Sequence, residues 1–167
     1  HYVIKNICLC LVASTALLAG SSHAASEYLM KIDGIPGTST MPGFEDFIEV
    51  QSWSMGFTQG VCQDLHFVRE MDTSSAELTG ATLSGVFYRS VILVALKTTG
   101  DGKPFTYMRL TLANSIFTSF QTGGSNGSSI VPMEQISLAP SSVKFELFKE
   151  GIAGAVATNT VTCQKPK

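Results

Sequence analysis

The stretch from Lys31 to Gln59 constrains the fold of this chain more than any other. It passes through Gly34, Pro36 and Gly37, where free glycine backbones and a proline that cannot donate predict a turn. Beyond the turn, residues of one face alternate with residues of the other, as in a long strand. One face holds Phe47, Glu49, Gln51, Trp53, Met55 and Phe57, and the other holds Ile48, Val50, Ser52, Ser54 and Gly56. Apolar residues on both faces are typical of a strand inside a β-barrel or β-sandwich.

The middle of the chain predicts more strands and one helix. Residues 65–71 alternate again, and Ser74-Ser-Ala-Glu77 has the spacing of a capping box. We therefore expect a helix of about two to three turns that ends near Gly85. Residues 86–97 form a long apolar run, and Thr99-Gly-Asp-Gly-Lys103 predicts a hairpin turn toward a strand over 105–114.

The last third continues in the same manner. Residues 115–122 predict a further strand, and 123–129 a flexible polar loop. Two segments, 131–138 and 142–148, predict a strand pair that turns at Ala139-Pro140, and 153–164 predicts a last strand. About nine strands, one short helix and no alternation of strand and helix indicate an all-β fold, a barrel or a sandwich.

The first 24 residues have the layout of a secretory signal peptide. Lys5 precedes an uncharged apolar run over 7–18, and Ser22 and Ala24 supply small residues before a cleavage point. Twelve apolar residues are too few to span a bilayer, and Ser21 stands where a lipoprotein would have its acylated cysteine. The alternative is a buried N-terminal helix. We predict a signal peptide over 1–24, one domain over 25–167, a secreted or periplasmic location and no stable membrane anchor.

Charge gives no sign of an anionic partner. Without residues 1–24 the chain has ten basic and thirteen acidic residues, a net charge of −3 with histidine neutral. The sequence therefore offers no electrostatic reason to expect nucleic acid as a partner. Charged residues make up only 14% of the chain, which is compatible with a subunit that buries its surface against neighbours and also with a secreted β-protein.

Two cysteines remain after the predicted cleavage. Cys8 and Cys10 lie in the apolar run, whereas Cys62 and Cys163 lie in the mature part. In an oxidising compartment these two are candidates for a disulfide, which would close a loop of about one hundred residues. The alternative is a pair of unbonded, buried thiols.

No catalytic or metal-binding pattern is evident. His66 is the one histidine outside residues 1–24, no Gly-x-Ser-x-Gly motif occurs, and Cys62 and His66 lack a second pair of ligands. Glu45 and Asp46 are adjacent residues at a strand start, as on a solvated edge. Residues 123–129 lack the lysine of a phosphate-binding loop. We therefore predict no enzyme activity and no cofactor.

Three blocks of the sequence, in order, resemble one known family. They are the segment Lys-Ile-Asp-Gly-Ile-x-Gly followed by Ile-Glu-Val-x-Ser-Trp-Ser-x-Gly within 31–56, the segment 64–78, and the segments 107–114, 122–125 and 133–138. Together they are similar to the haemolysin-coregulated proteins (Hcp), the ring-forming tube proteins of the type VI secretion system. The resemblance covers roughly residues 27–147.

The resemblance implies a compact two-sheet β-barrel of the Hcp type with one helix on its flank. It also implies a structural function: homo-oligomeric, hexameric rings that stack into tubes, with effector proteins as guests and a spike protein as a cap. Two departures bear on stacking. Phe44 stands where the family commonly has histidine, and residues 159–164 lack the family's frequent aromatic-Asp ending.

A second function belongs to another class of protein. An exported binding module could keep the Hcp barrel without assembling a tube, as the predicted signal peptide and cysteine pair suggest. Its ligand surface is expected at Phe44, at Trp53, which is otherwise a core residue or a platform for sugar stacking, and in the loop. The loop residues concerned are Gly123, Gly124, Ser125 and Asn126.

Overall fold

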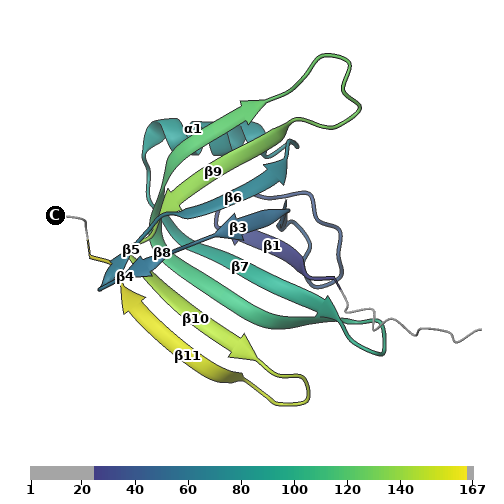
Figure 1. The fold of residues 1–167 in the computed structure, drawn as a ribbon, viewed down its shortest axis with the longest axis vertical. Coiled ribbons are helices and arrows are strands. Elements are labelled where there is room, and N and C mark those ends of the chain that lie inside the picture. The colour runs from purple at the N-terminus through teal and green to yellow at the C-terminus, as the bar shows by residue number, and fades with distance from the viewer. Residues whose placement is uncertain (1–24, 165–167) are drawn as a thin grey trace, which may run out of the picture.

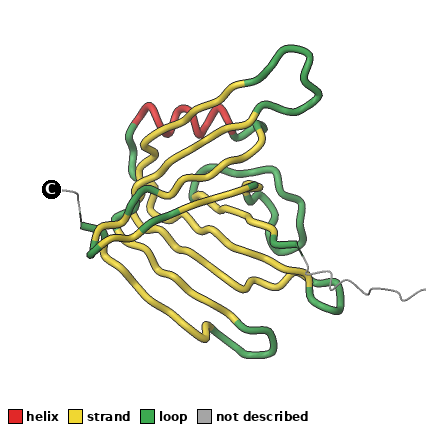
Figure 2. Tube along the Cα trace, in the orientation of Figure 1, coloured by secondary structure: helices red, strands yellow, loops and turns green. Residues whose placement is uncertain are grey.

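The computed structural model describes residues 25–164, so the predicted signal peptide over 1–24 lies outside the described residues. The described chain forms eleven strands and one helix (Figures 1 and 2). The strands are β1 (Glu27–Ile32), β2 (Ile48–Val50), β3 (Ser52–Ser54), β4 (Phe57–Thr58), β5 (Val61–Cys62), β6 (Leu65–Glu70), β7 (Tyr88–Thr98), β8 (Pro104–Gly123), β9 (Met133–Ala139), β10 (Ser142–Phe148) and β11 (Ala155–Thr162), and the helix is α1 (Ser75–Ser84).

Nine strands form two sheets in which every neighbouring pair is antiparallel. Sheet A has the order β2-β1-β7-β8-β10-β11, and sheet B has the order β8-β9-β6-β3. β4 and β5 form a small separate hairpin. The prediction of an all-β fold with one short helix and two sheets is confirmed.

β8 belongs to both sheets. Its first half pairs with β7 and β10, and its second half, from Ile116, pairs with β9. The two strands predicted over 105–114 and 115–122 are therefore one strand with a bend. Asn114 lies at the bend with a positive φ of 44°, a conformation that asparagine tolerates better than most residues.

The long strand predicted from Phe47 is interrupted at Gln51. Ile48 and Val50 in β2 are buried, but in β3 it is Trp53 that packs toward the core. The core-facing positions change from even-numbered residues in β2 to odd-numbered residues in β3. The prediction of one continuous alternation is therefore wrong. The reason is tertiary: β2 pairs with β1 in sheet A, whereas β3 pairs with β6 in sheet B. The chain crosses between the sheets at Gln51, whose backbone N–H donates to Val68 O at 2.8 Å.

The pairing predicted for residues 131–138 and 142–148 is also wrong. β9 pairs with β6 and β8 in sheet B, and β10 pairs with β8 and β11 in sheet A. Ala139-Pro140 is a crossing between sheets rather than a hairpin turn. The hairpin predicted over 99–103 is confirmed: Thr99 N–H donates to Lys103 O at 2.9 Å.

The core fills the space between the two sheets. Its central side chains come from β1, β2, β6, β7, β8, β9 and α1 and include Met30, Ile48, Phe67, Leu78, Leu93, Leu110 and Leu138. A second, smaller cluster lies on the opposite face of sheet A, where Leu29, Val94 and Leu96 are buried beneath Met41, Phe44 and Phe47.

The loop between β1 and β2 builds this second cluster by folding back over sheet A. Its backbone is held by hydrogen bonds such as Gly37 N–H to Asp46 O at 2.7 Å. A Cβ atom on Gly37 would lie 2.3 Å from the carbonyl oxygen of Phe47. Glycine is therefore required here for close approach of two backbone segments and not for a positive φ.

The helix α1 packs on β8 and inserts Leu78 and Ala81 into the core. It ends at Gly85, which has left-handed backbone angles, as the sequence predicts. The predicted capping box is wrong, because the Ser74 side chain makes no cap hydrogen bond. Its hydroxyl contacts Asp72 and Arg69 instead. Between residues 25 and 164, no helix is long and apolar enough to cross a membrane.

Candidate functional site

The outer face of sheet B carries two rows of uncharged side chains. Alternation along each strand points Leu65, Phe67 and Ile136 inward, so the residues between them point outward. Cross-strand pairing then aligns one row of Ser54, His66, Ser137 and Ser119 and a second row of Ser52, Val68, Gln135 and Gln121. We call these eight residues the sheet B outer rows. They contain hydroxyl, amide and imidazole groups but no carboxylate, ammonium or guanidinium group.

A hollow of about 330 Å³ lies on this face. It is lined mainly by members of the sheet B outer rows from β6, β8 and β9. At its floor His66 Nδ1 lies 2.6 Å from the hydroxyl oxygen of Ser137. The face can therefore form many hydrogen bonds through uncharged hydroxyl and amide groups.

The His66–Ser137 contact alone does not make a catalytic triad. Within residues 25–164, no carboxylate hydrogen-bonds to the His66 ring to orient it as a base. Nor do those residues contain a cluster of three or more His, Cys, Asp or Glu side chains that could hold a metal ion. What the described residues present on this face is a set of hydroxyl, amide and imidazole groups that can form hydrogen bonds.

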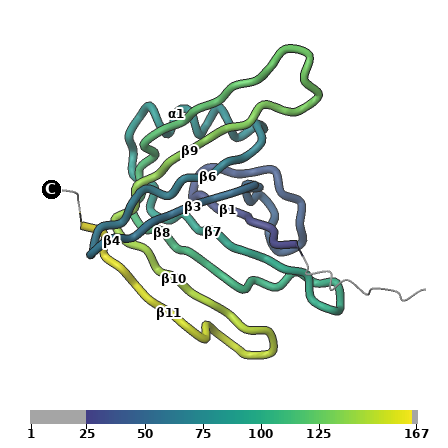
Figure 3. Tube along the Cα trace, in the orientation of Figure 1, coloured from purple at the N-terminus to yellow at the C-terminus, as the bar shows by residue number. Residues whose placement is uncertain are grey.

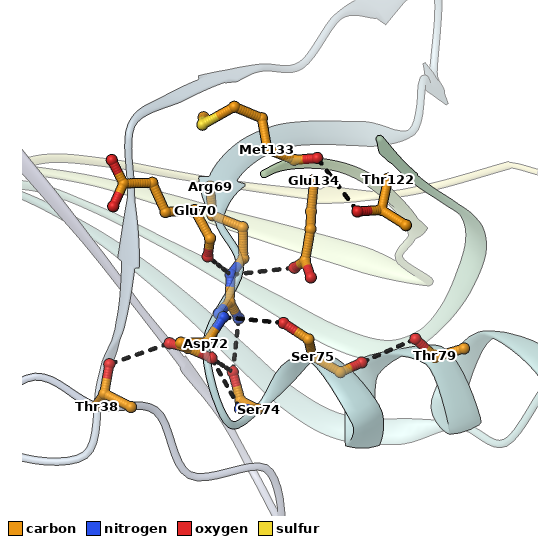
Figure 4. A network of polar contacts seen from close by, with 10 residues as sticks. All are labelled: Thr38, Arg69, Glu70, Asp72, Ser74, Ser75, Thr79, Thr122, Met133 and Glu134. Carbon is orange, nitrogen blue, oxygen red and sulfur yellow. Dashed lines mark hydrogen bonds and ion pairs between the residues drawn. The ribbon is translucent and has the colours of Figure 1, made fainter. Parts of the chain in front are cut away.

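A buried charged cluster lies on the core side of sheet B, where β6 ends and β9 begins (Figure 4). Arg69 and Glu134, register partners on β6 and β9, are both fully buried. Arg69 Nε lies 3.4 Å from Glu134 Oε2, and Arg69 Nη1 donates to Ser74 Oγ at 2.6 Å. Arg69 also forms an ion pair with Asp72. The cluster thus joins two strands to the start of α1.

Asp72 is the half-exposed member of this cluster. Burial raises the pKa of Asp72, but hydrogen bonds from Ser74 and Arg69, together with the charge of Arg69, outweigh it and leave the pKa below its usual value. Its backbone N–H donates to Ser75 Oγ and its carboxylate accepts from Ser74 N–H, at the start of α1. The charged form of Asp72 therefore stabilises the turn that leads into the helix.

The residues predicted as a ligand surface lie in separate places. Phe44 packs edge-on against Phe47 at 5.3 Å on the outer face of sheet A. Trp53 packs against the core and meets Tyr28 edge-on at 6.1 Å. Gly123, the last residue of β8, is exposed, as are Gly124 to Asn126 in the loop between β8 and β9, which projects beyond the sheets (Figure 1). The fold does not bring these three regions together.

Cys62 and Cys163 do come together. The structure places their sulfur atoms within bonding distance, with the Cα atoms 5.1 Å apart. They join the β4–β5 hairpin to the segment just after β11, although 101 positions separate them in the sequence.

The free edge of sheet A is the second prominent surface. β11 pairs only with β10, and all its residues except the half-buried Val161 are exposed. Its sequence, Ala-Val-Ala-Thr-Asn-Thr-Val-Thr, contains no charge. Val156 in this strand and the nearby side chains of Leu147 and Ile152 are exposed and apolar. Charged residues usually protect such an edge from pairing with another chain, and here they are missing.

Comparison with known proteins identifies the family. The family model described as "Type VI secretion system effector, Hcp" matches residues 29–147. The chain belongs to the Hcp family. This confirms the resemblance stated from the sequence, and the family consists of structural secretion proteins rather than enzymes.

Solved structures agree. Hcp1 from Salmonella typhimurium is 31% identical, with a TM-score of 0.71 over 81% of this chain and 92% of that one. Hcp2 from the same organism is 27% identical, with a TM-score of 0.67 over 81% and 95%. A type VI secretion system effector from Yersinia pestis, 22% identical, shares the fold with a TM-score of 0.70 over 81% and 98%. No curated protein sequence matches the chain.

Reasoning from the sequence missed the sheet B outer rows. Each strand shows alternation, but the alignment of serine and glutamine across four strands depends on register, which single strands do not reveal. The polar positions Ser54, His66, Gln121 and Gln135 could have been grouped only after pairing was known.

Proposed function

We propose that this protein is a structural subunit of a type VI secretion system that assembles into hexameric rings. Membership of the Hcp family supports this proposal, and the uncharged, exposed edge at β11 is the observation that carries it. A ring needs an interface that repeats head to tail and closes by rotation. An edge strand that exposes Val156, with exposed Leu147 and Ile152 beside it, fits one side of such an interface.

In this proposal the sheet B outer rows face the central channel. A channel that passes different effector proteins needs a surface that hydrogen-bonds without strong charge selection. The serine and glutamine rows fit that requirement. Stacking of rings into tubes and a cap made by a spike protein belong to the same proposal, in which the protein has no enzymatic activity.

Analytical ultracentrifugation of residues 25–167 at micromolar concentration tests the ring. We expect a hexamer for the unchanged protein and a monomer for Val156→Lys, because one charge placed in each of six interfaces would be buried without a partner. Leu83→Lys is the matched control: Leu83 is an exposed leucine on α1, away from the edge. A monomer at every concentration for the unchanged protein would overturn the ring.

A second candidate, an exported binding module without a tube, is favoured by the cysteine pair. Disulfides persist in oxidising compartments, so a pair brought together by the fold suits an exported protein. Phe44, Trp53 and the Gly123–Asn126 loop are then the surfaces to examine for ligand. A monomeric protein with its disulfide formed would favour this candidate over the ring.

We further propose that residues 1–24 are a cleaved signal peptide and that Cys62 and Cys163 form a disulfide in the exported protein. Intact mass after periplasmic expression should match residues 25–167 less two hydrogen atoms. A count of two free thiols in that material would refute the bridge. Retention of residues 1–24 would refute cleavage.

A further inference from the structure

The β4–β5 hairpin is weakly attached to the rest of the fold. Its two strands, of two residues each, pair only with one another in the described part of the chain. One more backbone bond closes the hairpin, from Gln63 N–H to Gly56 O at 2.9 Å. The turn between its strands passes through Gln59 and Gly60, which both have positive φ. Neither sheet therefore holds this hairpin in its hydrogen-bonded ladder.

The segment after β11 meets the hairpin at one end of the molecule, where the C-terminal strand reaches β4 in Figure 3. Gln164 N–H donates to Gly60 O at 3.1 Å, and the Gln164 side chain lies over Gly60. Cys163 N–H donates to Ser141 O at 2.9 Å. Apart from these contacts, the Cys62–Cys163 pair is what fastens the hairpin to the last strand.

Both cysteines lie at the margin of the core, against which they pack, and both remain partly exposed. Each is only half-buried, and both line a hollow of about 230 Å³ that also includes Phe87 and Pro140. The ladders of β7, β8 and β9 do not involve the hairpin. A thiol reagent can therefore reach the pair while the two sheets keep their pairing.

We propose that the Cys62–Cys163 bridge is a redox latch for this end of the molecule. When formed, it holds the β4–β5 hairpin and the end of β11 together; when reduced, both open locally while the two sheets remain folded. Closing the latch transfers two electrons and two protons from the two thiols to the disulfide of a thiol oxidant, which leaves as a dithiol. The protein would thus change the order of one end when it passes between reducing and oxidising compartments.

This inference rests on the bridge proposed above, so the first measurement is the free-thiol count of the exported protein. Hydrogen exchange is then compared for the oxidised protein, the reduced protein and Cys62→Ser/Cys163→Ser. In both open forms we expect exchange at the amides of Gln63, Cys163 and Gln164 to rise by roughly tenfold or more, with the amides of β7 and β8 unchanged.

Gln164→Ala in the oxidised protein is the control, because it removes the side chain over Gly60 and leaves both cysteines. Its hairpin amides should stay protected. With a thiol count of zero, unchanged exchange on reduction would overturn the latch, and so would a rise that spreads through β7 and β8. A thiol count of two would instead reject the bridge itself.

Discussion

β7 and β11 are both long strands of sheet A, and they differ in what covers them. In β7, Val91, Leu93 and Ala95 face the core while Val94 and Leu96 lie beneath the β1–β2 loop, so both faces are buried. In β11 nearly every residue is exposed on both faces. Their sequences differ in the same direction, since β7 has an unbroken apolar run from Val91 to Leu96 whereas half of the residues of β11 are threonine or asparagine.

The comparison shows that position in the sheet, rather than strand propensity, decides what a side chain contributes. β7 has a neighbour on each side and a layer over each face, whereas β11 has one neighbour and no cover. An uncovered, uncharged edge strand can pair with another chain, which promotes aggregation of a monomer but suits a subunit that assembles with its copies. The predictions below test this contrast between interior and edge.

The largest loss should come from a buried charge. Arg69→Met leaves the carboxyl group of Glu134 buried in the core without its partner, which we expect to lower the free energy of unfolding by about 3–5 kcal/mol. Arg69→Met/Glu134→Leu removes both charges and should recover most of that loss. Urea denaturation followed by circular dichroism measures both variants. A double variant no more stable than the single one would contradict a charge-pair origin for the loss.

A cavity in the centre of sheet A should cost slightly less. Leu93 is fully buried, so Leu93→Ala should lower the free energy of unfolding by about 2–5 kcal/mol. Val156→Ala, at a half-exposed position on β11, should change it by no more than about 0.5 kcal/mol in the monomer. The same denaturation assay compares them, and equal losses would break the contrast between interior and edge.

Removing part of the layer that covers the outer face of β7 should lower the free energy of unfolding by a smaller but measurable amount. Phe47→Ala removes a partly buried ring above Val94 and Leu96. We expect it to lower the free energy of unfolding by about 1–3 kcal/mol. Phe87→Ala, at a ring that is 69% exposed, is the matched control and should be close to neutral. If thermal unfolding gave the same midpoint for both, the β1–β2 loop would not be a stabilising layer.

The smallest predicted effect is on the pH dependence of stability, through Glu146 on β10. The hydrogen bond from Arg109, at 3.1 Å, lowers the pKa of Glu146, and the charges of Arg109 and Lys144 act in the same direction. This contribution is therefore complete above the unfolded value of about 4.3 and is lost as pH falls through the folded pKa. Glu146→Gln should flatten the stability profile below that value and leave its shape at neutral pH unchanged. A profile as steep as that of the unchanged protein would contradict the assignment.

Local sequence patterns determined much of this protein by themselves. Alternation placed Leu65, Phe67 and Arg69 on one face of β6, and all three are buried. The turn at residues 99–103 and the end of the helix at Gly85 follow from glycine residues, which adopt a positive φ without steric strain. The family could also be stated from three motifs, because its residues lie in contiguous blocks.

Tertiary structure alone decided which strands are neighbours. The crossings at Gln51, Asn114 and Ala139-Pro140 move the chain from one sheet to the other, and at each one the structure differs from the strand or pairing predicted from the sequence. The sheet B outer rows and the approach of Cys62 to Cys163 depend on those crossings. Contacts between distant segments are selected by the packing of the whole core, and no local pattern encodes them.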